Sequence, residues 1–79
     1  MTILAFGIAK EILGSYSISI ELNGVDNSVN GLKNFLEEKF PKLKELSSLR
    51  IAVNSHFASG EEIIEESDEI ALIPPVSGG

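Results

Sequence analysis

The chain has 79 residues, of which 43% are hydrophobic and 23% are charged, a balance typical of a soluble globular domain rather than a disordered segment. A formal net charge of -6 gives the surface a negative field that would repel a phosphate backbone, so we expect no nucleic-acid partner. The same field favours a partner with a basic groove. A domain of this size buries only about 60% of the surface that its unfolded chain exposes, which leaves little volume for a deep substrate pocket.

The sequence contains no cysteine, which excludes disulfides, thiolate metal sites and a catalytic or sulfur-carrying thiol. No stretch is long and apolar enough to span a bilayer, so we expect no membrane partner. The first residues also lack the basic region, apolar run and cleavage pattern of a secretion signal. The sequence therefore favours a cytoplasmic location.

The first elements in chain order are two predicted strands. Thr2 to Gly7 (TILAFG) is rich in β-formers, and Tyr16 to Leu22 (YSISIEL) alternates apolar and polar residues, which places Tyr16 on the same face as the isoleucines that follow it. Between them, Ala9 to Gly14 (AKEILG) is too short for a full helix and ends in glycine. We expect one helical turn or a wide hairpin connection there.

The main helix is predicted to begin after Ser28, whose hydroxyl stands where an N-cap would accept a backbone amide. Pro41 ends it. Gly31 in its first turns costs about 1 kcal/mol relative to alanine, which a well-packed face can offset. Apolar residues recur at helical spacing along one stripe, which comprises Val29, Leu32, Phe35, Leu36 and Phe40.

The remaining elements are short. A brief irregular turn should follow Pro41, after which Leu49 to Val53 (LRIAV) is a predicted strand and His56-Phe57 a possible edge strand. The stretch Glu61 to Glu66 is acidic. Ile70 to Ile73 (IALI) is apolar at every position, which is typical of a central strand covered on both faces.

The element order is strand, strand, helix, strand, short strand, strand. This order predicts an α+β fold of the β-grasp, or ubiquitin-like, type, with the first and last strands side by side in a mixed sheet of four to five strands and one main helix on one face. We assign residues 1–73 to this domain and residues 74–79 to an extended, flexible tail. Two prolines end strand pairing there, and two glycines offer no side chain to anchor.

The domain shows no catalytic constellation. His56 is the only histidine, and the acidic residues lack metal-ligand spacing, so we predict no metal site and interpret His56 as an exposed turn or edge residue. The adjacent acidic pairs are typical of solvated surface rather than acid/base catalysis. No glycine-rich loop leads into a helix with a lysine, so we expect no bound nucleotide.

The tail is the remaining candidate for chemistry. Six extended residues reach about 20 Å, enough to bring the terminal carboxylate into a pocket on another protein. Glycine at the last two positions lets a narrow channel close around bare backbone. A Gly-Gly end alone often marks a flexible terminus, but it is more specific after a predicted β-grasp domain. We therefore assign the carried group to Gly79 and passage through a partner's channel to Pro74, Pro75, Val76, Ser77 and Gly78.

Three stretches carry a family resemblance: FGIAKEILG (Phe6 to Gly14), RIAVN (Arg50 to Asn54) and SDEIALIPPVSGG (Ser67 to Gly79). In order and spacing they resemble the small subunit of molybdopterin synthase, with PPVSGG the most specific part. Lys10 stands where that family commonly has arginine, and Ser67 where it commonly has glycine. Lysine would loosen a bidentate contact to a partner at Lys10, and serine puts the turn geometry at Ser67 in doubt.

The resemblance implies a sulfur carrier for molybdenum cofactor biosynthesis. An E1-like enzyme would use ATP to adenylate the Gly79 carboxylate, and a sulfur donor would convert it to a thiocarboxylate. The tail would then enter the large synthase subunit, in a heterotetramer of two small and two large subunits, and give sulfur to a cyclic pyranopterin precursor. The chain would be a non-catalytic subunit that binds no cofactor, because ATP and metal would belong to the activating enzyme.

One helix can cover only one face of the sheet, which leaves a second face for partners. The strand pattern places Phe6, Phe57 and Ile73 on or beside that face, and we predict that they dock both the activating enzyme and the large subunit. The alternative is that they are core residues. With Lys10, they are the predicted partner-binding residues.

Other functions remain open at this point. Within the same class, the chain could carry sulfur for thiamine synthesis or tRNA thiolation. In a different class, it could be a ubiquitin-like modifier conjugated to lysines through Gly79, or an interaction module with an incidental Gly-Gly end.

Overall fold

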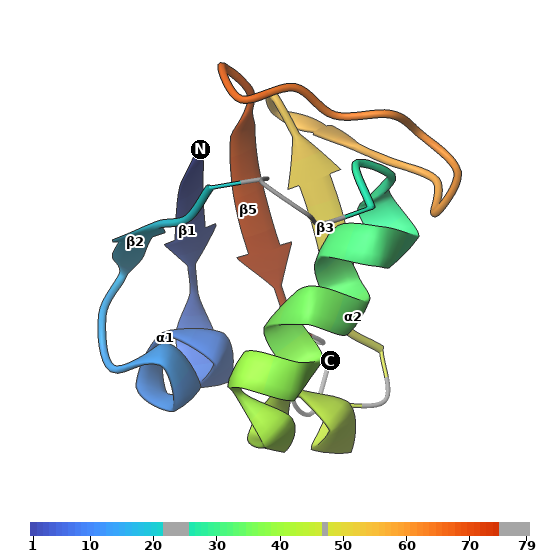
Figure 1. The fold of residues 1–79 in the computed structure, drawn as a ribbon. Coiled ribbons are helices and arrows are strands. Elements are labelled where there is room, and N and C mark those ends of the chain that lie inside the picture. Colours follow the sequence, from blue (N-terminus) through green and yellow to red (C-terminus); the bar gives the residue numbers. More distant parts are fainter. Residues whose placement is uncertain (22–25, 47, 75–79) are drawn as a thin grey trace.

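The computed structural model describes residues 1–21, 26–46 and 48–74 as a five-stranded mixed sheet crossed by one main helix (Figure 1). The strand order is β2-β1-β5-β3-β4. β1 and β5 pair in parallel, while β1–β2, β3–β5 and β3–β4 are antiparallel. In chain order the elements are β1 (Thr2–Ala5), α1 (Gly7–Leu13), β2 (Ser17–Ser19), α2 (Val29–Lys39), η1 (Pro41–Glu45), β3 (Arg50–Val53), β4 (His56–Phe57) and β5 (Glu69–Ile73).

This architecture confirms the predicted β-grasp fold. The first and last strands lie side by side in the centre of the sheet, with Ile3 opposite Ile70. α2 crosses one face and begins as predicted after Ser28, whose Oγ accepts a hydrogen bond of 3.0 Å from the Gly31 amide. After α2, the predicted irregular turn is the 3₁₀ helix η1, which begins at Pro41.

The core lies between α2 and one face of the sheet. Val29, Leu32 and Leu36 of α2 are buried, whereas Phe35 and Phe40 of the predicted stripe are only partly buried at its margin. From the strands, the core receives Ile3, Ala5, Ile51, Val53, Ile70 and Leu72. Among the described residues no polar or charged side chain is buried, so hydrophobic burial alone holds these layers together.

The second strand and the connection before it differ from the sequence prediction. α1 is a seven-residue helix rather than one turn, closed by Gly14 in the left-handed conformation. β2 starts only at Ser17, and the Tyr16 side chain is 67% exposed, although its carbonyl accepts a hydrogen bond of 2.9 Å from the Ala5 amide. The Ser15 hydroxyl donates to the Ser17 carbonyl at 2.9 Å and accepts from the Ser17 amide at 3.3 Å. Leu22, the last residue of the predicted strand, is outside the described residues.

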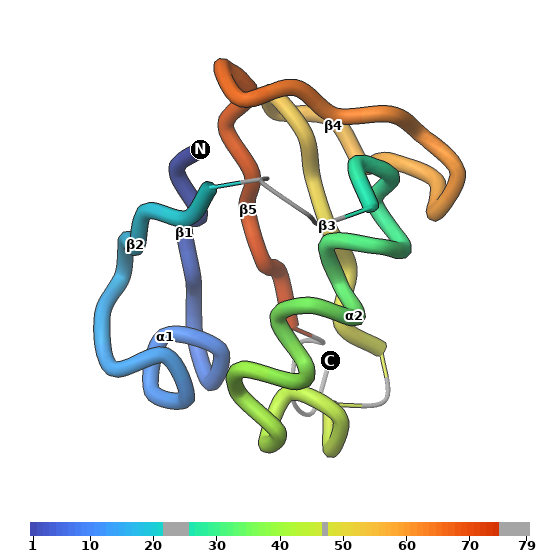
Figure 2. The backbone as a smooth tube through the Cα atoms, viewed as in Figure 1, coloured from blue at the N-terminus to red at the C-terminus, as the bar shows by residue number. Residues whose placement is uncertain are grey.

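The acidic segment between β4 and β5 passes beside the start of α2 (Figure 2). Carbonyl groups of Gly60 and Glu62 accept hydrogen bonds from the Asn30 and Val29 amides, both at 2.9 Å. These amides belong to the first turn of α2 and have no partner within the helix. The segment therefore caps the helix with its backbone, while Ile64 anchors it in the core.

Asp68 joins this segment to the turn that follows β3. Its carboxylate accepts from the Glu65 amide at 2.8 Å and from Asn54 Nδ2 at 2.9 Å, and these bonds hold the pKa of Asp68 below its ordinary value. Asn54 and Ser55 have positive φ, but Ser67 does not. The doubt about turn geometry at Ser67 is therefore removed, because serine is unstrained there.

The Gly31→Ala substitution should destabilise the protein, although alanine is the better helix former. A Cβ at Gly31 would overlap the carbonyl oxygen and side chain of Asp26, so the preceding loop would have to move. Overpacking of this kind outweighs the helix-propensity gain of about 1 kcal/mol, and we expect a net loss of about 1 kcal/mol in urea unfolding. Asn34→Ala, at an exposed position of the same helix, is the control and should not lose stability. A gain in stability for Gly31→Ala would contradict the packing.

The Asp68→Asn substitution should change how stability depends on pH. Because the folded-state pKa is depressed, the Asp68 carboxylate contributes stability above its unfolded pKa of about 3.9, and this contribution is lost as the pH falls through the folded pKa. The variant should therefore have a lower thermal midpoint than the parent at pH 7, and the difference should shrink at pH 3. Glu45→Gln is the control with the same change of charge. A difference that stays constant with pH would contradict the role of the carboxylate.

Candidate functional site

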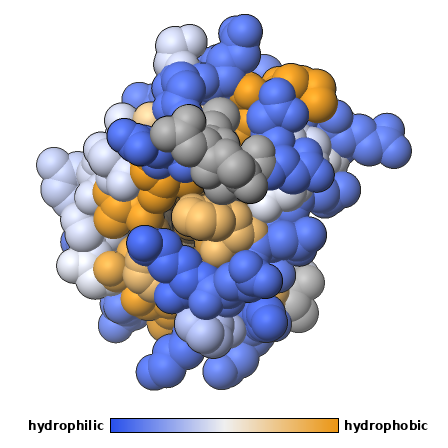
Figure 3. Space-filling view, in the orientation of Figure 1, coloured by the Kyte–Doolittle hydropathy of each residue, from blue (hydrophilic) through white to orange (hydrophobic). Residues whose placement is uncertain are grey.

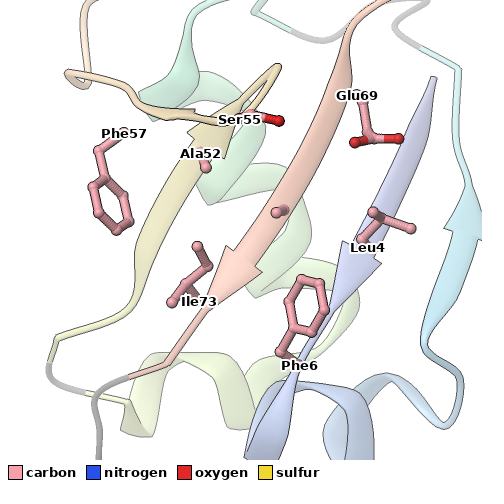
Figure 4. Close-up of a pocket in the computed structure, with 8 residues that line it drawn as sticks. Leu4, Phe6, Ala52, Ser55, Phe57, Glu69 and Ile73 are labelled. Carbon is pink, nitrogen blue, oxygen red and sulfur yellow. The ribbon is translucent and has the colours of Figure 1, made fainter.

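The face of the sheet opposite α2 carries a shallow apolar groove of about 220 Å³ (Figure 4). Strand register explains it. Leu4 pairs with Ala71, Ala71 with Ala52, and Ala52 with Phe57, so these four side chains form one row across four strands. The two central residues are alanines, and their small side chains leave the row hollow between Leu4 and Phe57. The groove is lined by Leu4, Phe6, Ala52, Ser55, Phe57, Glu69, Ala71 and Ile73.

The groove corrects the prediction for β5. The strand is central in the sheet, as predicted, but it is not covered on both faces. Ile70 and Leu72 point into the core and are fully buried, whereas Ala71 and Ile73 are only partly buried on the opposite face. Every residue from Ile70 to Ile73 is apolar because one face of the strand is buried in the core and the other face lines the groove.

The two aromatic residues predicted to bind partners form part of the rim of this groove. Phe6 and Phe57 are 52% and 54% exposed, so neither is a core residue. Ile73 lies between them in the view of Figure 4. The Phe6 amide donates to the Leu72 carbonyl at 3.4 Å, which continues the β1–β5 pairing by one residue and fixes Phe6 beside Ile73. Phe6 and Ile73 thus lie at the end of the groove nearest Pro74, while Phe57 lies on its rim beside Ala52, and the binding of partners by all three stays a prediction.

Hydrophilic residues cover much of the opposite side of the molecule, which carries α2 (Figure 3). Lys10, the fourth predicted partner-binding residue, lies exposed on α1 and does not line the groove. The structure therefore separates Lys10 from the other three.

The tail leaves the domain at the same end of β5. Pro74 is the last residue that the structure describes, and it packs beside Gly7, where an added Cβ would lie 3.2 Å from Pro74 Cγ. Gly7 has φ of 55°, a conformation that favours glycine. The start of α1 thus makes room for the first tail residue. The predicted tail residues Pro75, Val76, Ser77, Gly78 and Gly79 are outside the described residues.

Two charged residues of this face were missed by the sequence prediction. The guanidinium carbon of Arg50 lies 3.9 Å from the centroid of the Phe57 ring, a cation–π geometry, and Glu69 lines the groove at the end beyond Leu4. The two-residue period could have found both. It puts Arg50 on the same face as Ala52, and Glu69 on the same face as Ala71 and Ile73.

No metal centre is present in the described part of the chain, where no three acidic or histidine side chains lie close enough to hold an ion. His56 is exposed, as predicted, and its Nε2 lies 3.1 Å from Glu62 Oε2. None of the helices described here is long and apolar enough to cross a membrane. The features that the structure describes at this site are the apolar groove and Pro74 at its end.

Comparisons with known proteins agree with this arrangement. The ThiS family model matches residues 3–79, which includes Gly78 and Gly79. The molybdopterin synthase sulfur carrier subunit of Dictyostelium discoideum is 38% identical over 80 residues, covering 98% of this chain and 93% of its own. The subunit of the same name from Arabidopsis thaliana is 32% identical over 78 residues, covering 98% of this chain and 80% of its own.

Two solved structures are similar over nearly the whole chain. SAMP1 from Haloferax volcanii has a TM-score of 0.82 at 26% identity, covering 100% of this chain and 98% of its own. A chain of the complex of subunits 1 and 2 of the molybdopterin-converting factor from Helicobacter pylori has a TM-score of 0.68 at 28% identity, covering 99% and 96%. The chain therefore belongs to the ThiS family, as a relative of the sulfur carrier subunits of molybdopterin synthase.

Proposed function

We propose that the chain is a sulfur carrier for molybdenum cofactor biosynthesis and acts as the small subunit of molybdopterin synthase. The observation that carries this proposal is the match to relatives of that name over 98% of the chain. The exposed groove beside the root of the tail supports it, because a carrier needs a surface that partners can hold while its terminus reacts. The proposal includes a cytoplasmic location.

The proposed chemistry takes place at the Gly79 carboxylate. This group attacks the α-phosphate of ATP on an E1-like activating enzyme, giving an acyl adenylate and pyrophosphate. A sulfur donor then displaces AMP and leaves a thiocarboxylate, whose sulfur passes to a cyclic pyranopterin precursor. Adenylation turns a poor electrophile into a reactive one, and a chain without cysteine cannot divert the sulfur into its own disulfides. ATP binds the activating enzyme and not this chain.

The proposed docking face is the groove rimmed by Phe6, Phe57 and Ile73. It serves the activating enzyme and the large synthase subunit in turn, since both must receive the same tail. The similar chain from Helicobacter pylori comes from a complex of subunits 1 and 2, which supports a large-subunit partner here. We propose a heterotetramer of two small and two large subunits, with Lys10 contacting a partner from α1.

A second candidate function is that of a ubiquitin-like protein modifier. The likeness to SAMP1, a small archaeal modifier protein, favours it. Intact mass spectrometry of protein from its native cell separates the two, because a carrier gains the mass of one oxygen exchanged for sulfur and a modifier is attached to many proteins. Carriers for thiamine synthesis or tRNA thiolation would show the same mass gain. The pyranopterin precursor as acceptor distinguishes them.

Deleting Gly79 should abolish sulfur transfer and leave the fold unchanged. The deletion removes no strand or core residue, so the unfolding free energy should change by less than about 0.5 kcal/mol. It moves the carboxylate back by about 3.3 Å, although about 1 Å of misplacement can already cost a hundredfold in rate. Gly78→Val should also lose activity, because its side chain obstructs the narrow channel expected in a partner. The assay combines the activating enzyme, a sulfur donor, the large subunit and the precursor. Full activity of the deletion would refute the carrier mechanism.

The Phe57→Asp substitution should weaken binding to both the large subunit and the activating enzyme. It places a charge on the rim of the groove, and truncation of a central aromatic anchor commonly costs about 2 kcal/mol or more of binding energy. Tyr16→Asp is the matched control, because Tyr16 is also an exposed aromatic residue but does not line the groove. Calorimetry should show a loss of affinity of about thirtyfold for Phe57→Asp and near-parent affinity for the control. Equal affinities for the two variants would show that the docking face is misassigned.

A further inference from the structure

Opposite charges flank the groove: Glu69 lines it at one end, and Arg50, which does not line it, places its guanidinium on the Phe57 ring at the rim. Arg50 pairs across the strands with Ile73, at the end where the tail leaves the domain. Its guanidinium is stacked on the Phe57 ring, which restrains a side chain that would otherwise lose conformational entropy on binding. Neither ion pair in the described part of the chain involves Arg50. On a protein of net charge -6, this face therefore offers a positive group that pairs with no carboxylate among the described residues.

Glu69 marks the other end. It stands four residues before Ile73 on β5, which corresponds to about 13 Å along a strand. Its amide donates to Asn54 Oδ1 at 3.0 Å, so the backbone that carries the carboxylate is fixed. Its side chain lines the groove beyond Leu4 and takes part in neither of the ion pairs found among the described residues. Between these charged ends the floor is formed by Ala52 and Ala71.

We propose, resting on the docking role proposed above, that Arg50 and Glu69 fix the direction in which the large subunit lies on this groove. The occupant is a segment of that subunit with an apolar side chain that enters between Leu4 and Phe57. A carboxylate on one side of it pairs with Arg50, and a lysine or arginine on the other side pairs with Glu69.

Apolar contacts alone would hold a bound segment in the groove, but they would not determine which way round the segment lies. A segment seated in reverse would bury much the same apolar area, but it would bring like charges together at both ends. Direction matters for this protein because Pro74 follows Ile73 at the Arg50 end. With a fixed direction, the tail enters the partner from the same side in every complex. Arginine suits the position better than lysine, because its planar group both stacks on the ring and presents paired donors to a carboxylate.

The experiment measures affinity for the large subunit from the same cell by calorimetry, at low and at high salt. Arg50→Glu and Glu69→Lys should each weaken binding at least about tenfold at low salt, and the loss should be smaller at high salt. Lys44→Glu and Glu45→Lys are the matched controls. They make the same changes of charge at exposed positions on η1, away from the groove, and should stay within about threefold of the parent. Thermal midpoints establish that each variant is folded.

A compensating change supplies the decisive result. In the large subunit, the acidic residue that pairs with Arg50 is replaced by lysine. This change should restore much of the affinity of the Arg50→Glu variant for the large subunit and should weaken binding of the parent. If Arg50→Glu and Glu69→Lys bind no worse than their η1 controls, but Phe57→Asp weakens binding by about thirtyfold as predicted, the charges do not set direction and this inference is wrong. If Phe57→Asp also binds like the parent, the docking face itself is wrong. In either case, a mass gain equal to one oxygen exchanged for sulfur on the protein from its native cell would still support the carrier function.

Discussion

The parallel pairing of β1 with β5 is the constraint on which the rest of this structure depends. It joins the first strand of the chain to the last, so the domain can close only when the whole sequence is in place. The pairing sets the register of two faces at once. Ile3 and Ile70 meet on the inner face, and Leu4 and Ala71 meet on the outer one. A slip of one residue would exchange the two faces, which would put Leu4 in the core and expose the isoleucines.

The same pairing brings the functional elements together. β1 leads directly into Phe6 and Gly7, and β5 leads directly into Pro74, so a parallel arrangement delivers both to one end of the sheet. The groove and Pro74 therefore lie close together without any further element to hold them there. Burial of the inner face stabilises the arrangement, and α2 covers only that face, which leaves the groove on the outer face exposed.

The sequence predicted the elements whose signals are local. The Ser28 hydroxyl and Pro41 mark the ends of α2, and the element order was enough to place β1 beside β5. It also placed Phe6, Phe57 and Ile73 at one surface, because two-residue periodicity survives even in short strands. One failure concerns the last strand. Whether a face is covered depends on where the helix lies, so the outer face of β5 was mistaken for core.

Two contacts that depend on loop geometry could not be predicted from the sequence either. From the sequence alone, Gly31 is an unfavourable residue for a helix. The structure shows that Asp26 occupies the space that a side chain at this position would need. The stacking of Arg50 on Phe57 joins two strands across a turn with positive φ at Asn54 and Ser55. Neither contact follows from propensity or spacing, because each depends on the path of a loop.

The Ser15 hydroxyl has a consequence for how this molecule behaves in a crowded cell. β2 is an outer strand, and its free edge would ordinarily offer a template on which a second chain could extend the sheet. The Ser15 hydroxyl bonds to both the amide and the carbonyl of Ser17, and these two groups of the edge are therefore not available to another chain. A second chain that approached this edge would find the groups of Ser17 already engaged, so part of β2 is closed to sheet extension.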